Sequence, residues 1–392
     1  EAVFDYDNIL FLTLTGRKDW SSTLPEGDND FFYPSVGTSF VFSEIGGLKD
    51  SKVLTLGKLR ASYAEVGNDA KPYDIVPSYQ PQPTTGGGFA YGVTGANAEL
   101  KPEYRKSYEL GTELQFYNNR LGLDVAVYRT KTEDQIIRNL RLSYGTGFVV
   151  SSYNYGDSQT EGLEITLNAT PIRSDNFSWD FNVNYTKTES ELLNLPPTLS
   201  EYYISDTWLY GNVRAGSKVG GSLTTFTGAT YARNANGQVL VDPNSGYPIY
   251  DNTFQIIGDR NPDYMLGFQN AFNFYNFTFS FLLDFRKGGD VYNGNERYLW
   301  VNGYSARSLD REQPVVIDGV LRDGLENTDN PTKNNIQVTP FYQNGYYSAI
   351  PESDFIEKDI DWMRVRDITL SYRMPAKTMQ QIGFLNALSL SL

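Results

Sequence analysis

Short segments in which apolar and polar residues alternate are the feature that most constrains how this chain can fold. Along residues 107–116 the mostly apolar parity consists of Tyr108, Leu110, Thr112, Leu114 and Phe116. The other parity includes Glu109, Glu113 and Gln115. After a turn at Asn118-Asn119-Arg120, the alternation resumes over residues 121–130. Because side chains alternate faces along a strand, the pattern predicts a β-hairpin with one apolar and one polar face.

The links between the expected strands are short at one end and long at the other. We count about eleven strand candidates along the 392 residues. Short turns are expected at residues 118–120, 171–176 and 273–276, and long links at residues 72–95, 191–261 and 287–359. Long loops without structure of their own are uncommon in compact domains unless they are functional. Outer-membrane barrels have this asymmetry, with short periplasmic turns and long extracellular loops.

The polar parity carries charged residues in the middle of many strands. These are Lys58, Arg60, Glu109, Glu113, Asp124, Glu164, Asp180 and Asp284. In a secreted β-sandwich such charges face water, because the apolar face packs against a second sheet. In a membrane barrel the apolar face meets lipid and the charges line the lumen. Aromatic residues make up 15% of the chain, which suits girdles at two membrane interfaces. Together with the unequal links, this favours an all-β fold, a transmembrane antiparallel β-barrel, over the sandwich.

The composition excludes most catalytic chemistries. The chain has no cysteine and no histidine, so disulfides, thiolate metal sites and triads that need either residue cannot be built. A net charge of −14 argues against nucleic acid as a partner. Residues 242–246 suit a turn and lack the spacing of a calcium loop. We therefore expect no catalytic residue, no metal ligand and no cofactor. A secreted glycosidase that uses carboxylates alone stays open as an alternative.

The C-terminal segment breaks the simple alternation. Arg364 and Arg366 share a parity with Ile368, so we expect a β-bulge near Asp367. A brief helical turn is expected at residues 376–381, followed by a final strand. The chain begins without Met and ends within an alternating segment. We therefore expect a fragment of a longer protein.

A series of motifs lies in order along the chain. They are LTLTGRKDWSS at 12–22, FYPSVGTSF at 32–40, LGKLRASYAEVGN at 56–68, NAELKPE at 97–103, YELGTELQ at 108–115, NYGDSQTEGLEITLN at 154–168, IGDRNPDYMLG at 257–267 and WMRVRDITLSYRMP at 362–375. Each motif alone is weakly specific, but their order over nearly the whole chain is distinctive. The chain resembles the barrel half of SusC/RagA-type TonB-linked (TonB-dependent) outer-membrane transporters of Bacteroidetes.

The resemblance implies a 22-stranded barrel with an N-terminal plug in the cell outer membrane. It also implies active import of oligosaccharides or peptides, a SusD-like lipoprotein as a lid, and energy from the TonB-ExbB-ExbD complex. Residues 1–392 would then be the C-terminal portion of the β-barrel, surrounded by outer-membrane lipid. The signal peptide, plug domain, TonB box, early strands and last strand would lie outside this chain. The alternative is an outer-membrane barrel that serves as a scaffold for adhesion or protein secretion.

Aromatic residues in the two long loops near 191–261 and 287–359 are the candidates for substrate contact. The candidates are Tyr202, Tyr203, Trp208, Tyr210 and Trp300. Flat rings can stack on sugar faces or line a peptide groove, while their polar tips form hydrogen bonds. The same rings could instead pack the loops together or contact the lid protein, because Tyr and Trp are enriched at interfaces.

Overall fold

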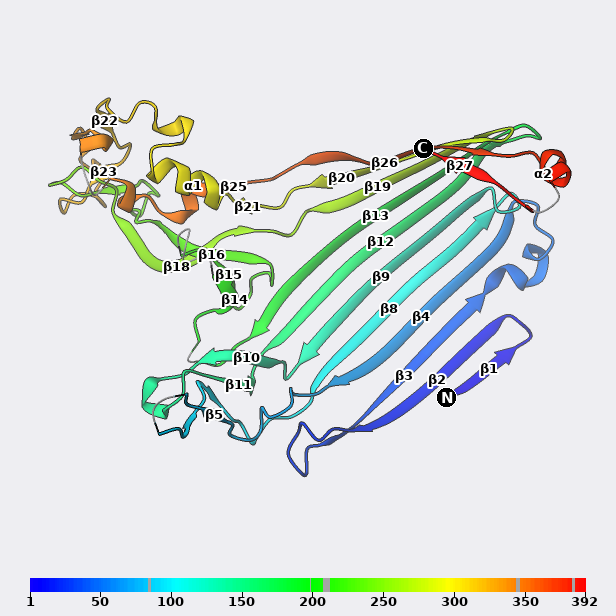
Figure 1. Cartoon of the computed structure of the whole chain (residues 1–392), viewed down its shortest axis with the longest axis horizontal. Coiled ribbons are helices and arrows are strands. Elements are labelled where there is room, and N and C mark those ends of the chain that lie inside the picture. The colour runs from blue at the N-terminus through cyan, green and yellow to red at the C-terminus, as the bar shows by residue number, and fades with distance from the viewer. Residues whose placement is uncertain (84–85, 198, 207–211, 343–345, 383–384) are drawn as a thin grey trace. The chain divides into compact units, whose positions relative to one another are not determined.

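The chain folds into two compact units in the computed structural model, which describes residues 1–83, 86–197, 199–206, 212–342, 346–382 and 385–392 (Figure 1). The sheet unit comprises Glu1–Thr198, Asp263–Lys287 and Asp361–Leu392. The loop unit comprises Leu199–Pro262 and Gly288–Ile360. None of the helices in the described part is long and apolar enough to cross a membrane.

Twelve strands of the described chain form one sheet in the sheet unit, and each pairs antiparallel with the next in the order of the sequence. They are β1 (Ala2–Tyr6), β2 (Leu10–Trp20), β3 (Asp30–Val41), β4 (Leu54–Asn68), β8 (Glu103–Phe116), β9 (Leu121–Glu133), β12 (Asp157–Arg173), β13 (Phe177–Asn194), β19 (Tyr264–Phe274), β20 (Phe277–Lys287), β26 (Trp362–Arg373) and β27 (Ser389–Ser391). Figure 1 shows them side by side in one continuous curved sheet. The additional strand relative to the sequence count is β1, whose five residues are too few for a clear alternation.

The links between these strands confirm the predicted asymmetry. The short links join the strands at one end, at residues 7–9, 42–53, 117–120, 174–176, 275–276 and 374–388. The links that join the strands at their other end are residues 21–29, 69–102, 134–156, 195–263 and 288–361. The link after β8 shows why the turns can be tight, because Asn118 and Asn119 adopt positive φ angles that asparagine tolerates well.

The antiparallel register gathers the large apolar side chains on one face of the sheet. Leu110 pairs with Val127, and Val127 pairs with Leu163 on the next strand. Leu110 is 58% exposed and Val127 is 46% exposed, so neither is covered by a second layer. An uncovered apolar face of this extent is typical of a surface that meets lipid. The charged residues predicted for the other face lie on the opposite parity.

A polar residue on the apolar face is hydrogen-bonded within the sheet. Asn270 of β19 is 8% exposed, and its Oδ1 accepts a hydrogen bond of 3.2 Å from the Trp179 indole. The Trp179 ring also stacks on Phe272, with 5.8 Å between ring centroids. Since lipid offers no hydrogen bonds, this contact removes the cost of placing an amide on that face.

The predicted irregularity in β26 is confirmed. Asp367 pairs with Leu282, but the next residue of β20, Leu283, pairs with Val365, so Arg366 is the extra residue of a β-bulge. The bulge places Arg364 opposite Asp284 on the polar face, while Val365 stays on the apolar face. The helical turn expected after Pro375 is α2 (Ala376–Ile382).

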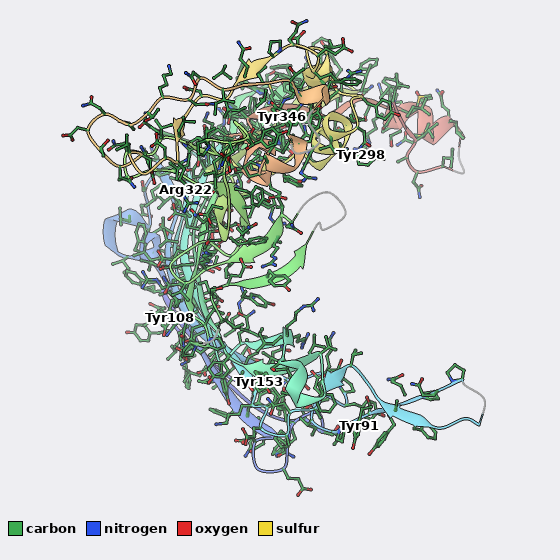
Figure 2. The ribbon with its side chains drawn as sticks, turned by 90° about the vertical axis from the view of Figure 1, so that its left-hand side faces the viewer. Tyr91, Tyr108, Tyr153, Tyr298, Arg322 and Tyr346 are labelled. Atoms are coloured by element: carbon green, nitrogen blue, oxygen red, sulfur yellow. The ribbon has the colours of Figure 1, made fainter. Side chains whose placement is uncertain are left out.

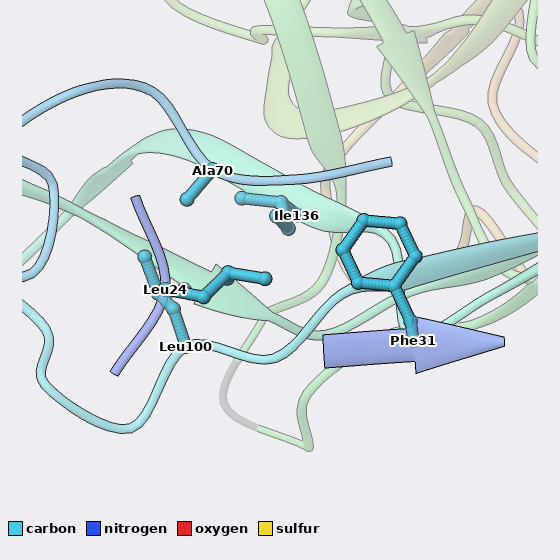
Figure 3. Close-up of a cluster of buried hydrophobic side chains, with 5 residues drawn as sticks. All are labelled: Leu24, Phe31, Ala70, Leu100 and Ile136. Carbon is cyan, nitrogen blue, oxygen red and sulfur yellow. The ribbon is translucent and has the colours of Figure 1, made fainter. Parts of the chain in front are cut away.

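The long links of the sheet unit contain structure of their own. They form β5 (Tyr79–Pro81), β6 (Phe89–Tyr91), β7 (Thr94–Gly95), β10 (Ile136–Arg141) and β11 (Val150–Asn154). Figure 3 shows the buried cluster that joins them, made up of Leu24, Phe31, Ala70, Leu100 and Ile136. Because these residues come from three different links and from β3, the cluster anchors the links beside the sheet edge.

The loop unit is built from the two longest links, which are folded rather than structureless. Its strands are β14 (Tyr202–Asp206), β15 (Arg214–Ser217), β16 (Thr225–Tyr231), β17 (Leu240–Val241), β18 (Tyr250–Asp259), β21 (Val291–Tyr292), β22 (Val315–Val316), β23 (Val320–Leu321), β24 (Gln337–Val338) and β25 (Ile356–Glu357). Its α-helix is α1 (Gly294–Val301). β14, β15, β16 and β18 form a four-stranded antiparallel sheet. β17 and β23 pair across the two links, so both links belong to one fold.

Short 3-10 helices complete the secondary structure. They are η1 (Phe42–Glu44), η2 (Gly46–Leu48), η3 (Tyr144–Thr146), η4 (Ala306–Ser308), η5 (Pro340–Tyr342), η6 (Tyr347–Ala349) and η7 (Glu352–Phe355).

Candidate functional site

Arg60 is the centre of an ion-pair network on the polar face of the sheet unit. Its Nη1 and Nη2 donate to the two carboxylate oxygens of Asp124, at 2.7 and 2.8 Å. Its Nε donates to Glu109 at 3.1 Å. Lys58 lies on the same face and pairs with Glu113, 3.4 Å from Nζ to Oε2. The paired contact with Asp124 fixes the orientation of the guanidinium, so this face presents ordered charges.

A glycine makes this network possible. Arg60 lies on β4 and Asp124 on β9, and β8 runs between them. Gly111 of β8 pairs directly with Arg60. A Cβ at Gly111 would lie 2.7 Å from the Arg60 guanidinium carbon. The missing side chain therefore lets the guanidinium cross β8 and reach the next strand.

A small recess lies beside the network on the same face. It has a volume of about 220 Å³, and its lining includes Phe11, Thr13, Ser39, Lys58 and Arg60. The ring of Phe11 gives it an apolar wall, and Lys58, Arg60 and Glu109 give it charges of both signs. This arrangement suits a small polar group rather than a whole ligand.

The loop unit contains two of the predicted aromatic residues on one strand. Tyr202 and Tyr203 lie in β14 and are half-buried. The Arg214 guanidinium lies 4.7 Å from the centroid of the Tyr203 ring and 4.1 Å from that of Phe254. Arg214 also forms an ion pair with Glu201. The cation therefore holds the Tyr203 ring in place through a cation–π contact.

Trp300 lies in the core of the loop unit. Its side chain is 8% exposed and packs in one cluster with Ile350 and Phe355. The Tyr347 ring meets it edge-on at 5.5 Å between centroids, and the Arg307 guanidinium lies 4.6 Å from its centroid. This is the loop-packing role that the sequence left open, and a ligand contact of Trp300 stays a prediction. Trp208 and Tyr210 lie outside the described residues.

More exposed rings occur near Trp300. Tyr298 of α1 is 53% exposed, and Tyr304, which follows the helix, is 78% exposed. Figure 2 labels Tyr298 among the side chains of this unit. These two residues lie within four positions of Trp300 in the sequence, but burial separates them from it, because α1 turns Trp300 inward. Periodicity over an eight-residue helix is too short a signal to make that distinction.

A buried carboxylate joins the two long links. Glu352 is 1% exposed and accepts a hydrogen bond of 2.6 Å from the Tyr250 hydroxyl and one of 3.1 Å from the Asn212 backbone N–H. The Arg297 guanidinium lies 3.9 Å from the carboxylate. Burial and the hydrogen bond to Glu352 raise the pKa of Tyr250. No sequence signal marks this residue, because an acid in a loop is expected to face water.

A second carboxylate fixes the ends of the links. Asp290 Oδ2 accepts from the Asp259 N–H at 2.9 Å and from Lys358 Nζ at 3.0 Å, and Oδ1 accepts from the Asp359 N–H at 3.1 Å. Burial acts to raise the pKa of Asp290, but these hydrogen bonds outweigh it and lower the pKa below its ordinary value. Asp290 is therefore held as a carboxylate.

Among the described residues, no group of three or more acidic side chains is arranged to hold a metal ion. The sheet unit thus offers a charged face, and the loop unit by itself offers a folded surface with aromatic residues. Both can hold a polar solute by hydrogen bonds and ring contacts.

Comparison with known proteins identifies relatives for this arrangement. The family model described as "TonB dependent receptor-like, beta-barrel" matches residues 1–281. TonB-dependent receptor P26 of Formosa agariphila is 27% identical, over 98% of this chain and 39% of its own length. TonB-dependent receptor SusC of Bacteroides thetaiotaomicron is 28% identical, over 70% of this chain and 29% of its own length. These matches confirm the resemblance noted in the sequence.

Solved structures agree with the sequence relatives. A structure of the RagAB peptide transporter aligns over 100% of this chain and 43% of the matched chain, with a TM-score of 0.74 and 19% identity. The RagAB peptide importer in its "closed-closed" state aligns with a TM-score of 0.73 and 17% identity. At this identity the likeness shows the fold alone. The chain spans about two fifths of the length of P26 and of the matched RagAB chain.

Proposed function

Because the chain belongs to the TonB-dependent receptor β-barrel family, we propose that it is the C-terminal portion of the barrel of an importer for oligosaccharides or peptides. The fold is that of a transmembrane antiparallel β-barrel located in the outer membrane. The family consists of transporters and receptors rather than enzymes. In the proposed importer, a SusD-like lipoprotein closes the extracellular side and the TonB complex supplies energy.

The two-faced sheet is the observation that carries the proposal. Its apolar face is uncovered, as at Leu110 and Val127, and its other face carries the Arg60 network. When such a sheet is completed to a closed barrel, the apolar face meets lipid and the charged face lines the interior. A charged interior gives a polar solute a path across the membrane that lipid does not.

The folded loop unit supports a role in capturing the solute. Long extracellular loops are the part of a barrel that differs between transporters with different ligands. The loop unit is held together by Glu352 and Trp300, so it offers a prearranged surface rather than two loose loops. Prearrangement lowers the entropy cost of binding. We assign Tyr202, Tyr203, Trp208 and Tyr210 to ligand contact within the loop unit. We assign Trp300 to the same site, where it acts by holding the residues that pack against it.

The import activity is tested in cells that carry the full-length protein. The expected result is uptake of its ligand that stops when TonB is deleted or the proton gradient is collapsed. The ligand class is read by mass spectrometry of small molecules co-purified with the native complex, where oligosaccharide and peptide are distinct outcomes. Uptake that persists without TonB would contradict the proposal. A purified complex that carries no ligand and no lipoprotein partner would favour an adhesion or secretion scaffold.

The aromatic residues are tested separately from import. Replacing Tyr203 by alanine in the full-length protein is expected to weaken binding of the co-purified ligand, because a stacking ring is removed. Tyr275, which lies in a short turn of the sheet unit, provides a tyrosine outside the loop unit for the control. Equal loss of affinity for the two variants would remove Tyr203 from the site.

A further inference from the structure

A polar pocket lies in the sheet unit at the end of the strands where the long links begin. It has a volume of about 420 Å³ and lies over the ends of β2, β3 and β4. Its lining includes Arg17, Lys18, Asp19, Ser21, Asn68 and Asp69. Arg17 and Asp19 share a parity with Thr13, which lines the recess beside Arg60 on the polar face. The pocket therefore lies at the rim of the face that lines the barrel interior.

Buried residues anchor the walls of this pocket. Phe31 lines the pocket and belongs to the buried cluster drawn in Figure 3. Two more residues of that cluster lie next to the pocket in the sequence. Leu24 donates its N–H to the Ser21 carbonyl at 3.4 Å, and Ala70 directly follows Asp69. Because the links on both sides of the pocket are tied to one core, its polar groups are prearranged for a ligand.

Both cations of the pocket are already paired with carboxylates. Arg17 Nε donates to Asp19 Oδ1 at 2.7 Å. Lys18 forms an ion pair with Asp30, which lies outside the pocket lining. These contacts balance the charge of Asp19 and occupy both cations. Asp69, the remaining carboxylate of the lining, is left with a charge that neither cation balances.

Hydroxyl groups hold the Asp69 carboxylate without neutralising it. Its Oδ2 accepts a hydrogen bond of 2.5 Å from the Ser21 hydroxyl and one of 3.2 Å from the Thr23 hydroxyl. In the parts of the chain that the structure describes, no lysine or arginine forms an ion pair with Asp69, and no donor reaches its Oδ1. The carboxylate is thus fixed in orientation, and its charge is complementary to a cationic ligand.

A neighbouring amide adds a second acceptor to the pocket. Asn68 donates a hydrogen bond of 2.6 Å from Nδ2 to Glu103, which leaves its Oδ1 as an acceptor. An ammonium group has three N–H donors, no acceptor and a positive charge, so it matches Asp69 Oδ1 and Asn68 Oδ1 together. A neutral hydroxyl group donates only one hydrogen bond and leaves the charge of Asp69 unbalanced. The pocket is therefore better suited to an ammonium group than to an uncharged sugar.

We propose that this pocket binds a primary ammonium group of the imported solute. Asp69 supplies the opposite charge, and Asn68 supplies an amide oxygen. Arg17 contacts Asp19 through Nε, so its two Nη groups are available to a carbonyl or carboxylate of the same solute. The inference rests on the proposed import function, and it narrows the ligand to a peptide with a free amino group or to an amino sugar.

The first test needs no substitution. The full-length protein in detergent is titrated calorimetrically with a pool of lysine-free octapeptides and with the same pool after N-acetylation. The expected result is about tenfold weaker binding of the acetylated pool, and a smaller difference at high salt, because salt screens an ion pair. A glucosamine hexamer and its N-acetylated form are the second pair, and they distinguish an amino sugar from a peptide as the source of the ammonium group.

The proposal is overturned if neither pair shows a difference between its free and acetylated forms, whether both forms bind or neither does. The binding assay does not involve TonB. Retained preference for the free amino group together with TonB-independent uptake would therefore contradict the import function and leave the ammonium site standing.

The second test locates the site. Asp69→Asn removes the charge but keeps an oxygen that can accept from Ser21 and Thr23, so it is expected to lower binding of the free pool to that of the acetylated pool. Asp175→Asn is the matched control, because it removes the same charge in the short turn at residues 174–176, outside the pocket. A preference that survives Asp69→Asn, or that the control also abolishes, would contradict the assignment. Both variants are compared only after heat-modifiable gel mobility confirms a folded barrel.

Discussion

Removal of the Glu352 carboxylate is predicted to open the loop unit while the sheet unit stays folded. Glu352→Ala leaves the Tyr250 hydroxyl and the Asn212 N–H, now hydrogen-bonded at 2.6 and 3.1 Å, without their acceptor. Loss of the acceptor of the partly buried Tyr250 hydroxyl costs roughly 1–3 kcal/mol, whereas Asn212 is exposed and its N–H can bond to water instead. Arg297 loses its nearby carboxylate as well, although the 3.9 Å separation makes this a smaller loss. The total is about 3 kcal/mol, the lower end of the range found when one partner of a buried charge pair is removed.

Hydrogen exchange of the full-length protein measures this change directly. Since each 1.4 kcal/mol is tenfold, amides of β15, β16 and β18 are expected to exchange about 100-fold faster or more in Glu352→Ala. Amides of β8 and β9 in the sheet unit are expected to keep their rates. Glu312→Ala is the control, because Glu312 is an exposed acid of the same unit. Unchanged exchange in β15 to β18, or equal acceleration by the control, would refute the reasoning.

Three further predictions concern single positions. Gly111→Ala is expected to push the Arg60 guanidinium away from Asp124 and to lower the unfolding free energy by about 1–2 kcal/mol, measured by denaturant unfolding in detergent. Gly122→Ala, where a Cβ meets nothing closer than 3.8 Å, is expected to change the unfolding free energy by less. Equal effects of the two substitutions would contradict the passage of the Arg60 guanidinium over Gly111. The lowered pKa of Asp290 means that its contribution to stability is present at neutral pH and is lost as the pH falls below 3.8. Hydrogen exchange in the loop unit is therefore expected to become faster below this pH in the unsubstituted protein and not in Asp290→Asn. Trp300→Ala is expected to destabilise the loop unit by about 3–5 kcal/mol, and loss of ligand binding with unchanged exchange rates would instead favour a direct contact.

Much of the sheet unit could be predicted from the sequence because its rules are local. Alternation along residues 107–130 defines the β8–β9 hairpin and both of its faces. The broken parity at Arg364 and Arg366 indicated the bulge, because a two-residue period cannot place both arginines and Ile368 on suitable faces. β1 was missed because five residues carry too little pattern.

The loop unit could not be predicted because non-local contacts determine it. β17 and β23 are two residues each and pair although about eighty residues separate them, which no local pattern reports. Glu352 has the sequence context of a surface acid, and only its partners from both links show that it is buried. The alternation predicted Arg60 and Asp124 as charges of the lumen face. Their contact could not be predicted, because it depends on the register of three strands and on Gly111 between them.

The assignment of the two sheet faces supports every other conclusion, and single cysteines test it most directly. In a cysteine-free background of the full-length protein, a cysteine is placed at Glu109 or at the adjacent Leu110 of β8, in outer-membrane vesicles. Glu109 pairs with Arg60 on the polar face, and Leu110 is 58% exposed on the apolar face. A membrane-impermeant maleimide is expected to label position 109, and a lipid-soluble reagent position 110. The reverse pattern, or water-accessible labelling of both positions, would contradict a barrel whose apolar face meets lipid.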